Sequence, residues 1–229
     1  MINKREKSEK KYRVLITGAS GGIGSAVAWK FLYAGHEVAG IDIRDAAVTD
    51  PRYTHYLCDI RDAEALPDIP GVDILINAAG TQNGPDDIGV NLEGLIAVTE
   101  RYGVRSGIRS VLNIGSASAH TGSEFPRYVA SKGGVMSYTR NVAKRIAPYG
   151  ATCNSLDPGG VLTELNDPVV NDRKLWNRIM KETPLRRWAS PCEIAEWAYF
   201  LTAVDSFCTG QCIVVDGGES INQRFVWPE

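Results

Sequence analysis

The chain has 229 residues, a formal net charge of −2 and a sequence pI of about 6.0. That length suits one α/β domain, and the near-neutral charge gives no reason to expect nucleic acid or an anionic membrane as a partner. No apolar run approaches the ~18 residues of a membrane span. The five cysteines form no Cys-x-x-Cys pair and the three histidines are scattered. We therefore predict a cytoplasmic protein without a metal site.

Residues 1–11 are polar and charged and lack the apolar centre of a signal peptide, so we expect a disordered leader before a single domain over 12–229. After the leader, β-rich runs alternate with helical patterns. The expected strands are Arg13–Thr17, His36–Ile43, Tyr53–Cys58, Asp73–Asn77, Ser110–Ile114, Thr152–Leu156 and Cys212–Val215. The expected helices follow Ile23 and cover Val90–Tyr102, Tyr128–Ala147, Val169–Glu182 and Pro191–Leu201. This alternation is typical of a doubly wound α/β fold, in which helices cover both faces of a parallel sheet.

A glycine-rich turn, Thr17–Gly24, connects the first strand to the first helix. Such a turn lets the backbone approach a pyrophosphate at the positive end of the helix. Asp42 closes the next strand 18 positions after Gly24, near the ~20 expected for the acid that binds the ribose of a dinucleotide. A carboxylate there repels a 2′-phosphate and favours NAD over NADP, whereas the nearby guanidinium of Arg44 leaves NADP open.

Tyr128 and Lys132 are four residues apart in a helical pattern, so their Cβ atoms lie about 5–6 Å apart on one helix face. A phenol has an ordinary pKa of about 10 and is a poor base at neutral pH. An adjacent ammonium favours the phenolate. The pair is a candidate acid/base centre, although the same spacing occurs on ordinary amphipathic helices.

Further motifs extend this pattern. They are the spacing Gly18-x-x-x-Gly22-x-Gly24, the run Asn77-Ala78-Ala79-Gly80, and Ser116 placed 12 residues before Tyr128. With Tyr128-x-x-x-Lys132, they make the sequence resemble the short-chain dehydrogenase/reductase family from Lys11 to about Gly218. The resemblance implies a single Rossmann-like domain, with a seven-stranded parallel sheet in the order 3-2-1-4-5-6-7. It also implies a homodimer or homotetramer.

The resemblance also implies a reaction, the transfer of a hydride between a nicotinamide and a secondary alcohol or ketone. Tyr128 would be the general acid in reduction and the general base in oxidation. Lys132 would lower the pKa of Tyr128 and bind the nicotinamide ribose. Ser116 would hold the substrate oxygen, with Ser118 as a local alternative. Asn91 would pass protons to solvent through water, or would only cap a helix.

The cofactor contacts implied by the resemblance come from six parts of the chain. They are Gly18, Ser20, Gly22, Ile23 and Gly24 in the turn; Asp42; Asp59 and Ile60; Asn77, Ala78 and Gly80; Tyr128 and Lys132; and Pro158, Gly159, Val161 and Thr163 at the nicotinamide. Asp59 would contact adenine, although it also fits an ordinary acid at a strand end.

The sequence departs from the family between Asn77 and Asn91, which are only 14 residues apart. We expect a loop over Thr81–Asp87, a more open cleft on that side and a changed or reduced helical contact between subunits. We also expect the aromatic tail Phe225–Glu229 to lie in a subunit contact or near a neighbour's cleft.

Substrate specificity is expected in Val161–Arg187, with His120–Pro126 opposite. The apolar residues of the first segment fit either a lid over the cleft or packing against the body. Hydroxysteroid, 3-oxoacyl and sugar or polyol substrates stay open, and an apolar lid mildly favours a bulky ring or acyl group. The alternative function is a sensor or scaffold that binds NAD without turnover.

Overall fold

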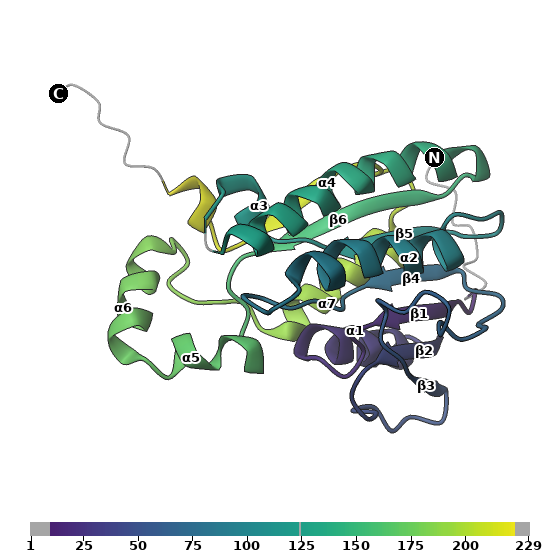
Figure 1. Cartoon of the computed structure of the whole chain (residues 1–229), viewed down its shortest axis with the longest axis horizontal. Coiled ribbons are helices and arrows are strands. Elements are labelled where there is room, and N and C mark those ends of the chain that lie inside the picture. The colour runs from purple at the N-terminus through teal and green to yellow at the C-terminus, as the bar shows by residue number, and fades with distance from the viewer. Residues whose placement is uncertain (1–9, 124, 223–229) are drawn as a thin grey trace, which may run out of the picture.

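A computed structural model describes residues 10–123 and 125–222. The tail Phe225–Glu229 and all of the expected leader except Lys10 and Lys11 lie outside these ranges. Seven parallel strands form one sheet in the order β3-β2-β1-β4-β5-β6-β7, which confirms the predicted fold class (Figure 1). The strands are β1 (Arg13–Thr17), β2 (Glu37–Asp42), β3 (Tyr53–Leu57), β4 (Ile74–Asn77), β5 (Ser110–Ile114), β6 (Thr152–Pro158) and β7 (Cys212–Val215).

The helices connect the strands largely where the sequence predicts them. They are α1 (Gly22–Tyr33), α2 (Leu95–Val98), α3 (Ser118–Thr121), α4 (Pro126–Ile146), α5 (Asp167–Val170), α6 (Arg173–Glu182) and α7 (Pro191–Tyr199). Helix α2 lies between the π-helical turns Gly89–Gly94 and Thr99–Gly103, and another such turn, Phe200–Val204, extends α7. Within the described ranges, no helix has the length and apolarity that crossing a lipid bilayer requires.

One predicted helix, Val169–Glu182, is wrong in its continuity, because the segment forms the two helices α5 and α6. The break has a local cause at Asp172. Its carboxylate accepts hydrogen bonds from the backbone N–H groups of Lys174 and Leu175, at 2.9 and 3.0 Å. Asp172 is therefore the N-cap of α6, a position that aspartate favours.

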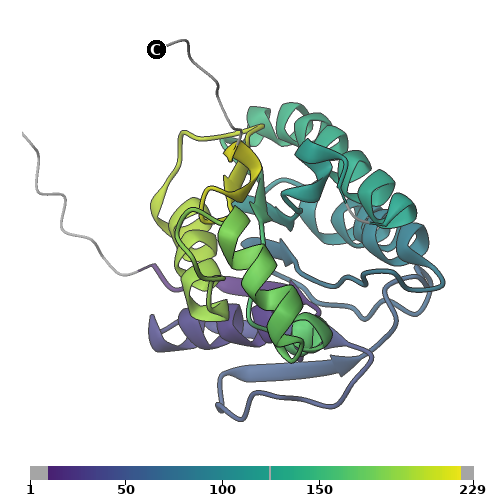
Figure 2. The same ribbon diagram turned by 90° about the vertical axis from the view of Figure 1, so that its left-hand side faces the viewer.

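Two hydrophobic clusters lie on opposite faces of the sheet, because strand side chains alternate between its faces. Val14 and Ile16 of β1 pack with α1 and α7, whereas Leu15 packs with α2 and α4. All three side chains are fully buried, as expected for a parallel strand covered on both faces. Figures 1 and 2 show these helix layers on either side of the sheet.

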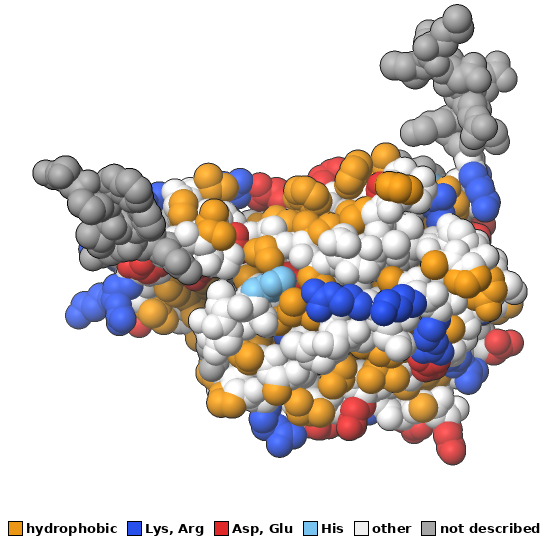
Figure 3. Space-filling view, turned by 90° about the horizontal axis from the view of Figure 1, so that it is seen from above, with side chains coloured by type: hydrophobic (Ala, Val, Ile, Leu, Met, Phe, Trp, Pro, Cys, Tyr) orange, Lys and Arg blue, Asp and Glu red, His pale blue; other side chains and the backbone are white. Residues whose placement is uncertain are grey.

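Helix α4 is amphipathic and borders the site. Its buried side includes Val135, Val142 and Ile146, while Arg140 and Lys144 are exposed. Lys and Arg side chains form a row on the face seen from above in Figure 3, the side on which α4 lies in Figure 1. Burial of one stripe of α4 fixes the direction of its first turns, which carry Tyr128 and Lys132.

The topology brings the carboxyl ends of the strands to one edge. The strand order reverses between β1 and β4: the chain proceeds from β1 to β2 and β3 on one side, and from β4 to β5, β6 and β7 on the other. Loops that leave β1 and β4 separate at this switch point, and the crevice between them is the usual ligand site of doubly wound folds.

Candidate active site

Two cavities lie at this edge of the sheet and share their central walls. One, of about 590 Å³, includes the glycine-rich turn and Asp42. The other, of about 440 Å³, includes Ser116, Tyr128 and Lys132. Both are lined by Ile23, Ala78, Gly80, Thr81, Thr163 and Leu165. The two cavities are therefore parts of one cleft, and most of the predicted site residues line it.

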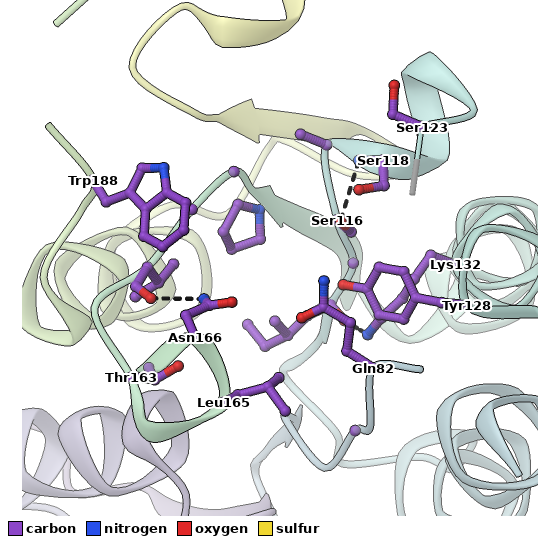
Figure 4. A pocket seen from close by; sticks show the side chains of 18 of the residues that line it. Gln82, Ser116, Ser118, Ser123, Tyr128, Lys132, Thr163, Leu165, Asn166 and Trp188 are labelled. Carbon is purple, nitrogen blue, oxygen red and sulfur yellow. Dashed lines mark hydrogen bonds between the residues drawn. The ribbon is translucent and has the colours of Figure 1, made fainter. Parts of the chain in front are cut away.

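Tyr128 and Lys132 reach the cleft from the first two turns of α4 (Figure 4). Helix α4 begins at Pro126, in a position that proline favours. The Lys132 side chain is buried, its Nζ donates a 2.8 Å hydrogen bond to the Ile114 carbonyl, and it lies 5.8 Å from the centroid of the Tyr128 ring. Burial lowers the pKa of Lys132 to about 8, against the opposing effect of Asp157 and Asp87. The backbone thus holds a titratable ammonium beside the phenol.

Ser116 follows β5 and lines the same cavity as Tyr128 (Figure 4). Its Oγ accepts a 3.1 Å hydrogen bond from the backbone N–H of Ser118, the first residue of α3. This bond orients the Ser116 hydroxyl. Ser118 lines the cavity too, so the predicted serine and its alternative belong to the same wall.

Asn91 is buried beside this site. Its Oδ1 accepts from the Thr81 N–H at 2.8 Å, and its Nδ2 donates to the Thr81 carbonyl at 2.9 Å and to Ser131 Oγ at 3.1 Å. A Cβ atom placed on Gly80 would lie 3.1 Å from Asn91 Oδ1 and 3.6 Å from Lys132 Nζ. Asn91 therefore lies near Lys132 across Gly80, and its predicted proton relay stays a prediction.

The short connection before Asn91 is a loop, as predicted, and it ends where α-helical backbone begins at Asp87. Asp87 is 1% exposed. Its Oδ1 accepts hydrogen bonds from Thr81 Oγ1 at 2.8 Å and from the Gly84 N–H at 3.0 Å. This carboxylate folds the loop back on itself, which keeps Thr81 and Gln82 on the wall of the cleft.

The glycine-rich turn forms the other end of the cleft. Gly18 has a φ of +66°, and a Cβ atom there would lie 2.6 Å from Ala79 Cα. A Cβ atom on Gly22 would lie 2.6 Å from Thr163 Cγ2, so the turn also contacts the segment after β6. Helix α1 starts at Gly22 and directs its N-terminus at the cavity. This closely packed cradle fits the pyrophosphate of a dinucleotide.

Asp42 is fixed at the end of β2. Its Oδ2 accepts from the Ser20 N–H and its Oδ1 from the Arg44 N–H, each at 2.9 Å. The Arg44 guanidinium lies 3.6 Å from Asp42 Oδ1 and 3.3 Å from Glu164 Oε2. Arg44 thus lines the same cavity, with its guanidinium near two carboxylates.

Asp59 lines the same cavity and is paired with Arg61 at 2.6 Å, and Arg61 also contacts Asp86 at 3.1 Å. Hydrogen bonding to Arg61 lowers the pKa of Asp59. These pairs connect the loop after β3 to the loop after β4. The predicted contact of Asp59 with adenine stays a prediction.

Ser20 and Asn77 are not among the described residues that line the two cavities. Asn77 is buried, and its Nδ2 donates to Thr99 Oγ1 at 2.8 Å and to Asn113 Oδ1 at 2.9 Å. It joins β4 to β5, and its predicted contact with the cofactor stays a prediction.

The outer wall of the cleft comes from the segment between β6 and α7, where α5 and α6 project beyond the end of the sheet (Figures 1 and 2). Five of its apolar side chains line the cavity: Val161, Leu165, Val169, Ile179 and Trp188. Trp188 also packs edge-to-face on Trp176 with ring centroids 5.1 Å apart. The lining side chains therefore face the cleft, as a lid requires, and Trp188 also packs against another residue of the same segment.

Two buried carboxylates near Lys132, Asp87 and Asp157, were not predicted from the sequence. Asp157 is the one charged residue of the fully buried strand β6, and an acid in such a run is a signal that could have found it. Within the described ranges, no three His, Cys, Asp or Glu side chains are grouped to hold a metal ion.

Comparison with known proteins shows which family of proteins this chain resembles in sequence. The family model described as enoyl-(acyl carrier protein) reductase matches residues 18–220. Galactitol 2-dehydrogenase (L-tagatose-forming) of Cereibacter sphaeroides is 31% identical over 240 residues, covering 90% of this chain and 94% of that protein.

Solved structures agree with the sequence comparison. Ligand-free aldohexose dehydrogenase of Thermoplasma acidophilum matches with a TM-score of 0.79 and 28% identity, over 96% of this chain and 98% of that one. The 3-ketoacyl-(acyl-carrier-protein) reductase of Brucella melitensis complexed with NADH matches with a TM-score of 0.80 and 27% identity, over 93% and 100%. With this fold, this cleft and these relatives, the chain belongs to the short-chain dehydrogenase/reductase family of oxidoreductases.

Proposed function

We propose that the protein is an NAD-dependent dehydrogenase that interconverts a secondary alcohol and a ketone of the sugar or polyol class. The observation that carries the proposal is the single cleft, which has Asp42 and the glycine-rich turn at one end and Ser116, Tyr128 and Lys132 at the other. The bound cofactor would supply the hydride acceptor or donor. Proton transfer and orientation are left to the side chains of this chain.

Tyr128 removes the alcohol proton during oxidation and returns it during reduction. Lys132 favours the phenolate, because its ammonium is held beside the ring by the Ile114 carbonyl. Ser116, oriented by the Ser118 N–H, donates a hydrogen bond to the substrate oxygen as negative charge develops there. Asn91 connects this group to solvent through water.

The cofactor preference rests on Asp42. Its two oxygens are held by backbone N–H groups, which fixes the carboxylate where it would accept hydrogen bonds from ribose hydroxyls. A 2′-phosphate at that place would meet the Asp42 charge. Arg44 already contacts Asp42 and Glu164, which weakens its case as a phosphate ligand. Both features support NAD.

The substrate class rests on the lining of the cleft. Besides the catalytic residues, hydroxyl and amide groups come from four segments: Thr81 and Gln82; Ser118, Thr121 and Ser123; Thr163 and Asn166; and Ser220. Apolar side chains line another part of the wall (Figure 4). A sugar or polyol needs hydroxyl partners along one side and tolerates apolar contact on its C–H face. The relatives named for galactitol and aldohexose support this choice, and the 3-ketoacyl-(acyl-carrier-protein) reductase makes an acyl group the competing class in the substrate panel below.

Replacing Tyr128 by phenylalanine tests the proposed acid/base group. We expect Tyr128→Phe to lower kcat by about 10²–10⁴-fold, since the proton has no acceptor, and to leave the Kd for NAD nearly unchanged in a fluorescence titration. The control is Tyr149→Phe, an exposed tyrosine just beyond α4. Turnover by Tyr128→Phe within a few-fold of the parent would rule out this role.

Replacing Asp42 by alanine tests the cofactor assignment. We expect Asp42→Ala to weaken NAD by roughly tenfold, equivalent to about 1.4 kcal/mol, and to narrow the gap between NAD and NADP. Calorimetric titration with both cofactors measures this, and Asp45→Ala, an exposed acid nearby, is the charge-matched control. If NADP binds the parent protein more tightly than NAD, the assignment is wrong.

A substrate panel tests the proposed class. We expect galactitol or D-glucose to exceed cyclohexanol and a 3-hydroxyacyl thioester in kcat/KM by at least about tenfold, because a wall that binds hydroxyls disfavours analogues without them. Reduction of NAD is followed at the nicotinamide absorbance. A preference for the thioester or for cyclohexanol would contradict the class. Clear NAD binding without any turnover would favour the alternative, a non-catalytic NAD-binding sensor.

A further inference from the structure

Asp157 is a carboxylate for which the mechanism above has no use. It lies near the end of β6, directly before Pro158, and is fully buried. Its Oδ2 lies 2.6 Å from Nε2 of His120 on α3, and its Oδ1 accepts a hydrogen bond from Ser155 Oγ. A buried carboxylate is costly unless it is hydrogen-bonded or paired. His120 and Ser155 supply these partners, and the charge that they hold inside the protein can act on other buried groups.

The position of Asp157 relative to the catalytic residues indicates which group its charge acts on. A Cβ atom on Gly115 would overlap Asp157 Oδ1, so the carboxylate is pressed against the backbone between Ile114 and Ser116. The Ile114 carbonyl accepts the hydrogen bond of Lys132 Nζ. The buried anion and the buried cation therefore lie against consecutive residues of one backbone segment, which also leads into Ser116.

We infer that Asp157 is a positioning residue for catalysis, which keeps Lys132 charged through its electrostatic field, while His120 holds the carboxylate in place. The inference rests on the proposed role of Lys132 beside Tyr128. In the described part of the chain, Asp157 and His120 are not among the residues that line the two cavities. They would therefore act on catalysis through Lys132, without touching the substrate.

The charges around Lys132 allow this assignment. Tyr128 lies on its own helix, Asp87 faces it from the loop after β4 and Asp157 from β6. His120 from α3 and the thiol of Cys212 from β7 face Asp157 in turn. Burial lowers the pKa of Lys132 to about 8, and Asp157 acts against this effect more strongly than Asp87.

The consequence for catalysis follows from the sign of this effect. Without the Asp157 charge, burial would act on Lys132 with less opposition, and its pKa would fall further. A larger fraction of Lys132 would then be uncharged at neutral pH, and the uncharged form does not favour the phenolate of Tyr128. The acid limb of kcat/KM for alcohol oxidation would therefore move to higher pH.

The test measures the Lys132 titration directly in the cofactor-free protein. Lysine labelled with ¹³C at Cε is followed by NMR between pH 6 and 11, with Lys132→Arg used to assign the signal. We expect Asp157→Asn, which keeps the shape of the side chain, to lower the Lys132 midpoint by about one pH unit. The control, Asp73→Asn, removes an acid at the other end of the sheet, beside Arg13, and should leave the midpoint in place.

An unchanged Lys132 midpoint in Asp157→Asn would overturn the inference. Should that variant fail to fold, Asp157→Ser replaces it, and failure of both to fold would assign the carboxylate to folding and likewise overturn the inference. Because the titration needs neither substrate nor cofactor, its outcome is separate from that of the proposed function. If the protein oxidises galactitol or D-glucose, the pH profile of kcat/KM provides a second readout. Its acid limb should lie at higher pH in Asp157→Asn than in the parent protein.

Discussion

The buried ammonium of Lys132 is the group on which the chemistry of this cleft depends. Burial makes its charge costly, and the Ile114 carbonyl and the nearby carboxylates offset that cost. A fully solvated lysine would keep its charge at any working pH, but would be too mobile and too well hydrated to act on one phenol. The fold has to shield Lys132 from water and still keep it protonated.

The sheet meets both requirements through its topology. β5 supplies the Ile114 carbonyl and then Ser116, and β6 supplies Asp157 directly before the Pro158–Gly159 turn. The paired register of these strands places Ile114 opposite Leu156, so backbone hydrogen bonds of the sheet fix the positions of Ile114 and Asp157. Helix α4, packed by its apolar stripe, brings Tyr128 and Lys132 to the same edge.

Local patterns explain what could be predicted from the sequence. The parallel sheet, the glycine-rich turn and Asp42 follow from hydrophobic runs, turn residues and spacing, and the structure places these features together. The pairing of Asp157 with His120 has no such pattern, because the two residues are 37 positions apart and come from different strand-to-helix connections. Asp87 bonds locally to Thr81 and Gly84, but its proximity to Lys132 depends on the tertiary fold. The break between α5 and α6 could have been predicted from the sequence, since aspartate at position 172 is a residue type that favours the N-cap of a helix.

The central claim is that the Lys132 charge makes Tyr128 a usable base. It is tested most directly by the titration of Tyr128 itself, with ¹³C at Cζ of tyrosine observed by NMR and assigned through Tyr128→Phe. The account predicts a Tyr128 midpoint below the ordinary value of about 10, and a rise of that midpoint in Lys132→Met. A Tyr128 midpoint at or above the ordinary value, unchanged by Lys132→Met, would contradict it.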